Sequence, residues 1–323
     1  MKVGIMGTGA YGMALSSILV NNCEVTMWTK FEDEKDNLVR TRKNEDLLPG
    51  FILGDGVVVT NDLEECIKDK DLIIIALPTP FVNDLCINMK PYIKDNRILI
   101  ASKGIEQGSG LLIHEMIENN LDTDKISVLS GPSFAQDLIE EYPQGLTIAS
   151  HDDESLKIIE QVFKDKKINF MKSHDLIGVE LCGSVKNFMA IGSGILNGLE
   201  VNESTKAMFL TRAMTTMKEL LLLLGCEKET MDSYAGIGDL LLTATSEKSR
   251  NFTFGYALGK GMSIEEKDAY VEKTTVEGYH TLDSIRTLLV KKNKVVELIE
   301  VLYHICFEGA PAKKLLEYLT NKQ

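Results

Sequence analysis

Residues 2–20 read KVGIMGTGAYGMALSSILV, and this stretch decides the fold. A short apolar run is followed by Gly7, Gly9 and Gly12 in the spacing GxGxxG, and then by a second apolar segment. The order predicts a strand, a tight turn and a helix. Gly7 permits the turn, Gly9 lets a pyrophosphate approach the backbone, and Gly12 lets helix and strand pack. A glycine-rich turn without a ligand is the alternative, but the strand, turn and helix in this order favour a dinucleotide site.

Beyond this stretch, short β-branched runs alternate with amphipathic segments as far as Met171. The alternation is typical of a parallel sheet covered by helices. Strands are expected at 3–6, 24–28, 57–60, 72–76, 98–101, 126–129, 146–149 and 168–170. After Asp175 the apolar residues follow a helical period. We therefore expect an α/β protein: a Rossmann-type doubly wound sheet and dinucleotide-binding domain over 1–174, a helical substrate and catalytic domain over 175–323, and the site between them.

The composition excludes several classes of partner. The 323 residues carry 35 Lys and Arg against 48 Asp and Glu, a net charge of −13 that disfavours nucleic acid and anionic membrane surfaces. The apolar runs are too short for membrane insertion. An anionic substrate must therefore be gathered by a few local cations.

Six cysteines are spread along the chain without a CxxC pair or a zinc-type Cys/His spacing. We expect reduced thiols in a cytoplasmic protein, and no metal. The histidines are dispersed and no serine or cysteine elbow accompanies them, so a hydrolytic triad is not indicated.

The choice of cofactor depends on the end of the second strand, Trp28-Thr29-Lys30, where an NAD site usually carries an acid for the ribose hydroxyls. No acid stands there in the sequence. Lys30 is positioned for the 2′-phosphate of NADP, although three acids follow it at 32–34, and a solvated loop lysine is an equal alternative. The sequence therefore leaves the choice between NAD and NADP as cofactor open.

Later strands end in residues suited to a site, because ligands of open α/β sheets bind at the carboxyl ends of strands. Lys103 follows one such strand, and standing alone it would be an ordinary loop lysine. Gly131 and Ser133 follow another, where small residues allow close approach of the backbone and Ser133 offers a hydroxyl. A rigid Gly-Pro turn is the alternative there.

In the helical half, Lys186 lies in the middle of an apolar stripe that includes Val179, Cys182 and Met189. A lysine on such a face is paired, snorkelling, or placed in a cleft for function. Burial and nearby cations would lower its pKa, as a general base at neutral pH requires. Asn187 follows and can orient a substrate oxygen.

A second cluster runs from Asp239 to Asn251. Asp239 can hold a lysine or a substrate hydroxyl, and Arg250 and Asn251 can grip a phosphate. Separately, Asp239 is explained as a helix cap and Arg250 as a surface cation; the combination points to a site. Glu277, near Thr275, is a candidate carboxylate on the cofactor side, with an ordinary loop as the alternative.

These segments together resemble the NAD(P)-dependent sn-glycerol-3-phosphate dehydrogenases of the bacterial type. The matching stretches are GTGAYGMALS, NEDLLPG, ASKGIEQG, GPSFAQDL, GVELCGSVKNFMAIGSG, AGIGDLLLT, SEKSRN, TVEGYHT and CFEG. The resemblance implies interconversion of sn-glycerol 3-phosphate and dihydroxyacetone phosphate, feeding glycerophospholipid synthesis. It also makes a homodimer plausible.

The resemblance further implies roles for particular residues. Lys186 would be the catalytic acid/base, with Lys103 and Asp239 setting the reacting carbons. The cofactor residues would be Gly7, Gly9, Ala10, Tyr11, Gly12, Lys30, Lys103, Ala135, Arg250, Thr275 and Glu277. The substrate residues would be Lys103, Gly131, Ser133, Lys186, Asn187, Asp239, Thr243, Ser249, Arg250 and Asn251.

Three features depart from the family pattern. Tyr11 stands in place of a common tryptophan and Lys30 in place of arginine, which leaves the cofactor preference open. Cys182 and Ser184–Val185 vary the usual Gly-Ala-Leu around Lys186. Two other functions stay in view: a related dehydrogenase acting on a carboxylate, and a nicotinamide-sensing module without turnover. The oligomeric state, the direction in vivo and regulation are not determined by the sequence.

Overall fold

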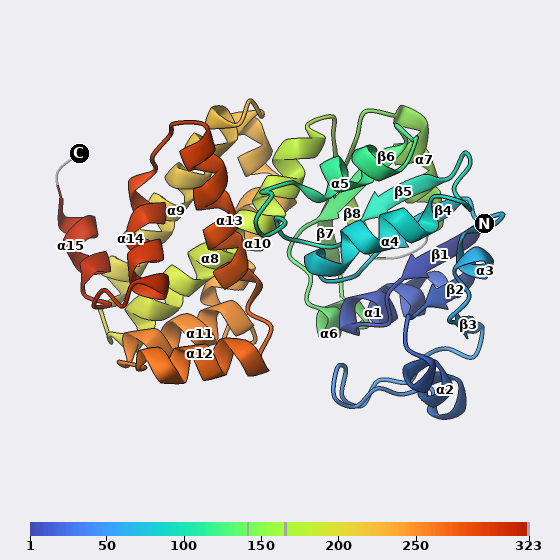
Figure 1. The fold of residues 1–323 in the computed structure, drawn as a ribbon, viewed down its shortest axis with the longest axis horizontal. Coiled ribbons are helices and arrows are strands. Elements are labelled where there is room, and N and C mark those ends of the chain that lie inside the picture. Colours follow the sequence, from blue (N-terminus) through green and yellow to red (C-terminus); the bar gives the residue numbers. More distant parts are fainter. Residues whose placement is uncertain (141, 165–166, 322–323) are drawn as a thin grey trace. The chain divides into compact units, whose positions relative to one another are not determined.

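The protein is described from a computed structural model, which covers residues 1–140, 142–164 and 167–321 (Figure 1). The final two positions of the predicted second domain, 322 and 323, lie outside the described residues. The chain divides into two compact units. Unit 1 comprises Met1–Ser102 and Ile113–Val179, and unit 2 comprises Lys103–Leu112 and the chain from Glu180 onward. The short segment 103–112 therefore groups with the helical unit, although it lies within the N-terminal half of the sequence.

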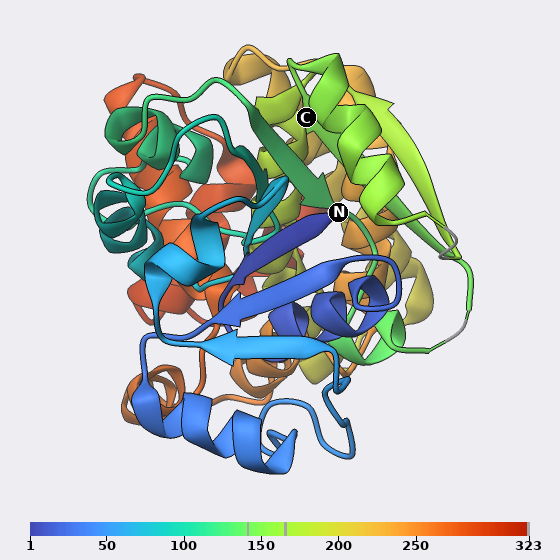
Figure 2. The same cartoon turned by 90° about the vertical axis from the view of Figure 1, so that its right-hand side faces the viewer.

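Unit 1 contains an eight-stranded sheet in the order β3-β2-β1-β4-β5-β6-β7-β8. The strands are β1 (Lys2–Met6), β2 (Glu24–Trp28), β3 (Val57–Thr60), β4 (Leu72–Ile75), β5 (Arg97–Ile100), β6 (Ile126–Ser130), β7 (Gln144–Ser150) and β8 (Ile168–Ser173). All eight expected strands are confirmed, with bounds that shift by no more than three residues. The sheet is parallel from β3 to β6, and Figure 2 shows the blue strands of this part with their arrowheads toward one edge.

The β6–β7 pair departs from the parallel pattern, because β7 runs antiparallel to β6 and β8 then runs parallel to β7. Among the described residues that connect β6 to β7, the four-residue α6 (Ala135–Leu138) is the only helix. A parallel pair needs a full crossover, whereas an antiparallel neighbour can follow a shorter connection.

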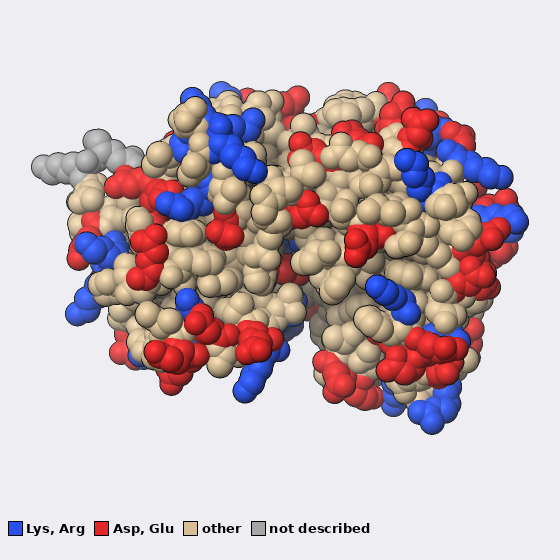
Figure 3. All heavy atoms as spheres, in the orientation of Figure 1, with Lys and Arg blue, Asp and Glu red and all other residues tan. Residues whose placement is uncertain are grey.

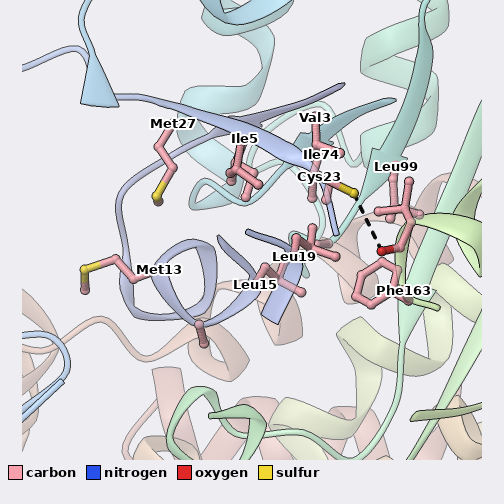
Figure 4. Close-up of a cluster of buried hydrophobic side chains, with 14 of the residues drawn as sticks. Val3, Ile5, Met13, Leu15, Leu19, Cys23, Met27, Ile74, Leu99 and Phe163 are labelled. Atoms are coloured by element: carbon pink, nitrogen blue, oxygen red, sulfur yellow. Dashed lines mark hydrogen bonds between the residues drawn. The ribbon is translucent and has the colours of Figure 1, made fainter. Parts of the chain in front are cut away.

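The helices of unit 1 are α1 (Ala10–Leu19), α2 (Glu32–Thr41), α3 (Leu63–Ile67), η1 (Thr79–Phe81), α4 (Val82–Met89), α5 (Ile113–Asn120), α6 and α7 (Asp153–Val162). The core forms where α1 packs on the first strands, and Figure 4 shows Val3 and Ile5 of β1 near Leu15 and Leu19 of α1. Each fully buried aliphatic side chain of this kind contributes about 1.5–3 kcal/mol. This packing fixes the start of α1 relative to the end of β1.

Unit 2 is built almost entirely from helices, as the sequence predicts. They are α8 (Leu176–Gly198), which begins in the last residues of unit 1, α9 (Glu203–Leu223), η2 (Lys228–Asp232), the π-helical turn η3 (Tyr234–Gly238), α10 (Asp239–Thr245), α11 (Arg250–Gly259), α12 (Ile264–Lys273), α13 (Glu277–Lys291), α14 (Glu297–Phe307) and α15 (Lys314–Thr320). The segment 103–112 adds one antiparallel bridge, between Ile105 and Leu112.

All six cysteines are buried, and none of them forms a disulfide bond. Burial raises the pKa of Cys66, Cys86 and Cys306 to about 12, so these thiols stay protonated and unreactive at neutral pH. On the face drawn in Figure 3, both acidic and basic side chains appear, and each sign forms small local groups. Across the part of the chain that the structure describes, no helix combines the length and the apolar character that a membrane span requires.

Candidate active site

The predicted site residues fall into two groups, one in each unit. In unit 1 the glycine turn joins β1 to α1 at the point where the strand order reverses, since β2 and β4 flank β1 on opposite sides. Open α/β sheets bind ligands at such a switch point. The amide of Gly7 donates to the carbonyl of Trp28 at 2.9 Å, which ties the turn to the end of β2.

The three glycines of the turn have different surroundings. Gly7 has φ +121°, a conformation that other residues rarely adopt, and a Cβ there would also lie 2.7 Å from the carbonyl oxygen of Ala76. A Cβ on Gly12 would meet the carbonyl oxygen of Gly7 at 2.4 Å, so helix and turn are in backbone contact. A Cβ on Gly9 would meet nothing within 4 Å. Gly9 is therefore the glycine whose missing side chain leaves open space, which fits the close approach of a pyrophosphate to the first turn of α1.

The β6–α6 connection reaches the same helix. The hydroxyl groups of Tyr11 and Ser133 lie 3.0 Å apart, and the Ser133 hydroxyl donates to the carbonyl of Gly131 at 3.3 Å. Ala135 begins α6 directly afterwards, and Ala10 begins α1. These predicted residues are thus brought together on one side of the glycine turn.

The end of β2 holds an acid that the sequence pattern does not reveal. The hydroxyl of Thr29 donates to the carboxylate of Glu34 at 2.5 Å, so the first turn of α2 folds back and places a carboxylate at the strand end. Lys30 is exposed, and among the described residues no ion pair is recorded for it. Glu34 is one of the three acids at 32–34 that follow Lys30 in the sequence, but its contact with Thr29 depends on how the chain turns after β2 and has no sequence signal.

The charged centre of unit 2 consists of Lys103, Lys186 and Asp239, which we call the lysine–aspartate cluster. Lys186 lies in α8, Asp239 begins α10, and Lys103 begins the segment 103–112. One carboxylate oxygen of Asp239 accepts from the ammonium of Lys186, and the other accepts from Lys103 at 2.8 Å. Asp239 is fully buried and Lys186 is 6% exposed. The single carboxylate thus faces two ammonium groups, so with both protonated the cluster has an excess positive charge.

The buried position changes the acidity of Lys186. The pKa of its ammonium is lowered to about 7: burial lowers it most, Asp239 raises it in opposition, and the neighbouring Lys103 adds to the lowering. A lysine of this kind exists in both protonation states near neutral pH, as proton transfer in both directions requires. The hydroxyl of Thr243, one helical turn after Asp239, lies 3.5 Å from the same carboxylate.

Asp239 owes its position to an irregular backbone. The π-helical turn η3 precedes it, and a Cβ on Gly236 would lie 2.1 Å from the carbonyl oxygen of Met231. Only glycine permits this close approach, which lets α10 begin with a buried acid. Such π-helical turns are often found at functional sites.

A network of amides joins α8, α11 and α13 next to the cluster. Asn187 donates to the carboxylate of Glu277 at 3.2 Å, and Asn251 donates to the side-chain oxygen of Asn187 at 3.2 Å. The backbone amide of Gly278 donates to Asn251 at 2.8 Å. A Cβ on Gly278 would lie 2.6 Å from the backbone of Asn187, so this glycine allows α13 to start against α8. From the sequence, Gly278 is noted only as the neighbour of the candidate Glu277, with no packing role.

The helix α11 is held against α8 by glycines on both sides. A Cβ on Gly194 would lie 2.1 Å from the carbonyl oxygen of Phe252, and one on Gly255 would lie 2.0 Å from that of Ile191. The backbones are therefore in contact, which fixes the N-terminus of α11 near the amide network. Ser249 caps that terminus by accepting from the amide of Phe252.

At this terminus the guanidinium of Arg250 is largely exposed and lies 4.0 Å from the carboxylate of Glu277. An exposed, loosely paired guanidinium is available to an anionic ligand. Thr275 is exposed in the loop before α13, and no contact with the cluster is recorded for it. The structure thus brings together all the predicted residues of unit 2 except Thr275.

A separate cavity of about 440 Å³ lies in unit 2 between the ends of α11, α12 and α14, and none of the predicted residues lines it. Within the described ranges, no group of three or more His, Cys, Asp or Glu is placed to hold a metal ion.

Comparisons with known proteins agree with this arrangement. Family models described as the N-terminus and the C-terminus of NAD-dependent glycerol-3-phosphate dehydrogenase match residues 2–156 and 175–317. A glycerol-3-phosphate dehydrogenase [NAD(P)+] of Lactobacillus delbrueckii subsp. bulgaricus is 34% identical, with 100% of this chain and 97% of that protein covered. The corresponding protein of Teredinibacter turnerae is 34% identical, with coverage of 99% and 94%.

Among solved structures, the glycerol-3-phosphate dehydrogenase of Coxiella burnetii superposes with a TM-score of 0.91 at 30% identity, covering 99% of each chain. The two family models span most of the sequence, and the relatives align over its whole length. The chain belongs to the NAD-dependent glycerol-3-phosphate dehydrogenase family.

Proposed function

We propose that the protein interconverts sn-glycerol 3-phosphate and dihydroxyacetone phosphate, with NAD or NADP as the hydride carrier. The observation that carries the proposal is the buried lysine–aspartate cluster in a chain of this family. The open space over Gly9 at the start of α1 fits the pyrophosphate of the cofactor. When bound, the nicotinamide ring supplies or accepts the hydride.

In the reducing direction, protonated Lys186 donates its proton to the C2 oxygen of dihydroxyacetone phosphate as that oxygen gains negative charge. The cluster's excess positive charge stabilises this oxygen in a site with little water. Asp239 keeps the Nζ atom of Lys186 in place before and after the transfer. In the oxidising direction, neutral Lys186 takes the proton from the C2 hydroxyl, and a pKa of about 7 allows both roles.

Arg250 and the N-terminus of α11 bind the phosphate in this proposal. Asn251 already uses one amide hydrogen for Asn187, which leaves the second for a phosphate oxygen. The phosphate is remote from C2, so its binding energy serves to position the reacting carbon. Such positioning can supply several kcal/mol of the barrier reduction.

The roles of the remaining site residues differ between the two predicted domains. We propose that 1–174 binds the dinucleotide through the glycine turn, Tyr11, Lys30 and Ala135, while Gly131 and Ser133 of this domain contact the substrate. The range 175–323 carries the catalytic helices. Six cysteines without a disulfide bond fit a reducing compartment, so we propose that the protein is cytoplasmic. Its product would supply the glycerol phosphate backbone of phospholipids, and a homodimer is the proposed assembly, to be tested by light scattering.

One assay tests the reaction. The purified protein is mixed with dihydroxyacetone phosphate and either NADH or NADPH, and the absorbance of the reduced nicotinamide is followed. We expect oxidation of the cofactor with this substrate and none with a 2-keto acid. Turnover with the keto acid alone would indicate a carboxylate dehydrogenase, and cofactor binding without turnover would indicate a sensing module.

A further inference from the structure

The segment 103–112 is hydrogen-bonded to helices of unit 2 at several points between Lys103 and Ser109. Ser184 of α8 accepts from the amide of Gly104 at 3.0 Å, and Ser284 of α13 donates to the carbonyl of Ile105 at 3.3 Å. Farther along, His280 lies 2.9 Å from the amide nitrogen of Gln107, and Lys291 donates to the carbonyl of Ser109 at 2.9 Å. The bonds nearest Lys103 are buried, whereas those farther along are exposed.

The hydroxyl of Ser184 is oriented for this contact. It donates its own hydrogen to the carbonyl of Glu180 at 3.0 Å, which leaves its lone pairs for the amide of Gly104. Ser184 is fully buried and Gly104 is buried as well. Gly104 has φ +138°, so the chain turns sharply just after Lys103 in a conformation that only glycine adopts readily.

We propose that Ser184 is a positioning residue, which holds Gly104 against α8 and thereby keeps the ammonium of Lys103 on Asp239. Lys186 lies two residues after Ser184 in the same helix. One stretch of α8 thus supplies both the proton-transferring lysine and the anchor for the second lysine. The inference rests on the function proposed above.

The consequence for catalysis follows from the charges around Lys186. In the described part of the chain, the charged groups that act on its ammonium are Asp239 from α10 and Lys103 from the segment 103–112. Lys103 lowers the pKa of Lys186, because two cations close together disfavour each other. If Lys103 withdraws from Asp239, the pKa of Lys186 rises.

The test is the variant Ser184→Ala, measured as kcat against pH in both directions. We expect kcat at pH 7 for glycerol 3-phosphate oxidation to fall about tenfold, the equivalent of about 1.4 kcal/mol. We also expect both pH profiles to shift to higher pH, as in Lys103→Ala. A merely structural role of Ser184 would lower the melting temperature without moving the pH profile.

Three further variants sharpen the test. Ser184→Thr keeps the acceptor and should keep the wild-type pH profile. Ser184→Cys keeps a compact side chain with a much weaker acceptor, and should shift the profile in part even if the alanine variant fails to fold. Lys291→Ala removes an exposed bond to the same segment far from Lys103, and should leave kcat unchanged.

The double variant Ser184→Ala with Lys103→Ala should be no slower than Lys103→Ala alone, because the serine acts through the lysine. Fully multiplicative effects, or an unshifted profile in both Ser184→Ala and Ser184→Cys, would overturn the proposal. Titration of the Lys186 Nζ resonance by NMR reports the same pKa without turnover. An inactive wild-type enzyme would therefore remove the proposed function, while the NMR titration would still decide the role of Ser184.

Discussion

The glycine turn of unit 1 and the lysine–aspartate cluster of unit 2 are built on opposite principles. The turn has no charged side chain: it consists of backbone, and Gly9 contributes by leaving space. The cluster is the reverse, with one fully buried carboxylate between two ammonium groups. A dinucleotide carries its own charge and needs amides and room, whereas a small ketone needs a proton and a positive charge at one atom.

This difference predicts how each region fails. A substitution in the turn should alter either folding or cofactor affinity. A substitution in the cluster should alter the rate of the chemical step with folding intact. The five experiments below separate these outcomes, beginning with the largest expected effect.

Lys186→Ala should lower kcat by about 10²–10⁴-fold, because it removes the proton donor. The melting temperature should change little, since Asp239 keeps its bond to Lys103. Steady-state kinetics and thermal unfolding check both expectations. The control is Lys267→Ala, which alters another buried lysine of unit 2 outside the cluster and should leave kcat close to wild type. Wild-type turnover in Lys186→Ala would refute the assignment.

Arg250→Ala should raise the KM for dihydroxyacetone phosphate about 10–100-fold, because a hydrogen bond to a charged group contributes about 1.5–3 kcal/mol. The side chain is 59% exposed, so stability should be unchanged. Lys260→Ala, which alters an exposed cation at the other end of α11, is the control. If KM stays the same for Arg250→Ala, the phosphate is bound elsewhere.

Gly12→Ala and Gly9→Ala form a matched pair within the turn. The methyl group at position 12 would lie 2.4 Å from a backbone oxygen, so the free energy of unfolding should fall by about 1–3 kcal/mol. The methyl group at position 9 meets no protein atom, so stability should change by less than about 1 kcal/mol. Calorimetric titration with NADH should show weakened binding for Gly9→Ala. Unchanged affinity there would place the pyrophosphate away from this turn.

The pH dependence of turnover should differ between the two directions. Lys186 must be neutral to accept a proton, so kcat for glycerol 3-phosphate oxidation should rise as pH passes through about 7. Lys186 must be charged to donate a proton, so kcat for ketone reduction should fall over the same range. In Lys103→Ala both transitions should move to higher pH. Transitions that move to lower pH would contradict the charge arrangement described here.

Glu34→Gln should change the preference between the two cofactors, with the smallest effect of the five. The carboxylate held by Thr29 can accept hydrogen bonds from ribose hydroxyls and repels a 2′-phosphate. We expect the ratio of kcat/KM for NADH to that for NADPH to fall about fivefold, near 1 kcal/mol. Glu32→Gln, in the same helical turn and paired with Lys35, is the control. An unchanged ratio would leave Lys30 as the residue to test next.

The sequence predicted the fold well because its signals are local. Each strand of unit 1 is a short apolar run, and the glycine spacing marks the β1–α1 turn without any knowledge of the rest of the chain. The antiparallel β6–β7 pair was not foreseen, since the direction of a strand depends on its connection and partner. The stripe on α8 likewise singled out Lys186, because a helix shows its period in the sequence.

The long-range contacts that complete the site could not be predicted from local sequence signals. Ser184 holds Gly104 across 80 positions, and Asn187 meets Asn251 across 64. No sequence spacing predicts either pair, because such contacts depend on how the helices cross. For the same reason the sequence placed residues 103–112 in the sheet-bearing half. Their position in the chain is visible in the sequence, but their hydrogen bonds to α8 and α13 are tertiary contacts.

The glycine contact between α8 and α11 has one further consequence. Where Gly194 and Gly255 let two main chains touch, no rotamer can lengthen or shorten the gap. The distance from Lys186 to the first turn of α11 is therefore fixed by main-chain contact between the two helices. A fixed distance suits a substrate of one length, and a methyl group added at either glycine would push the helices apart and change that distance.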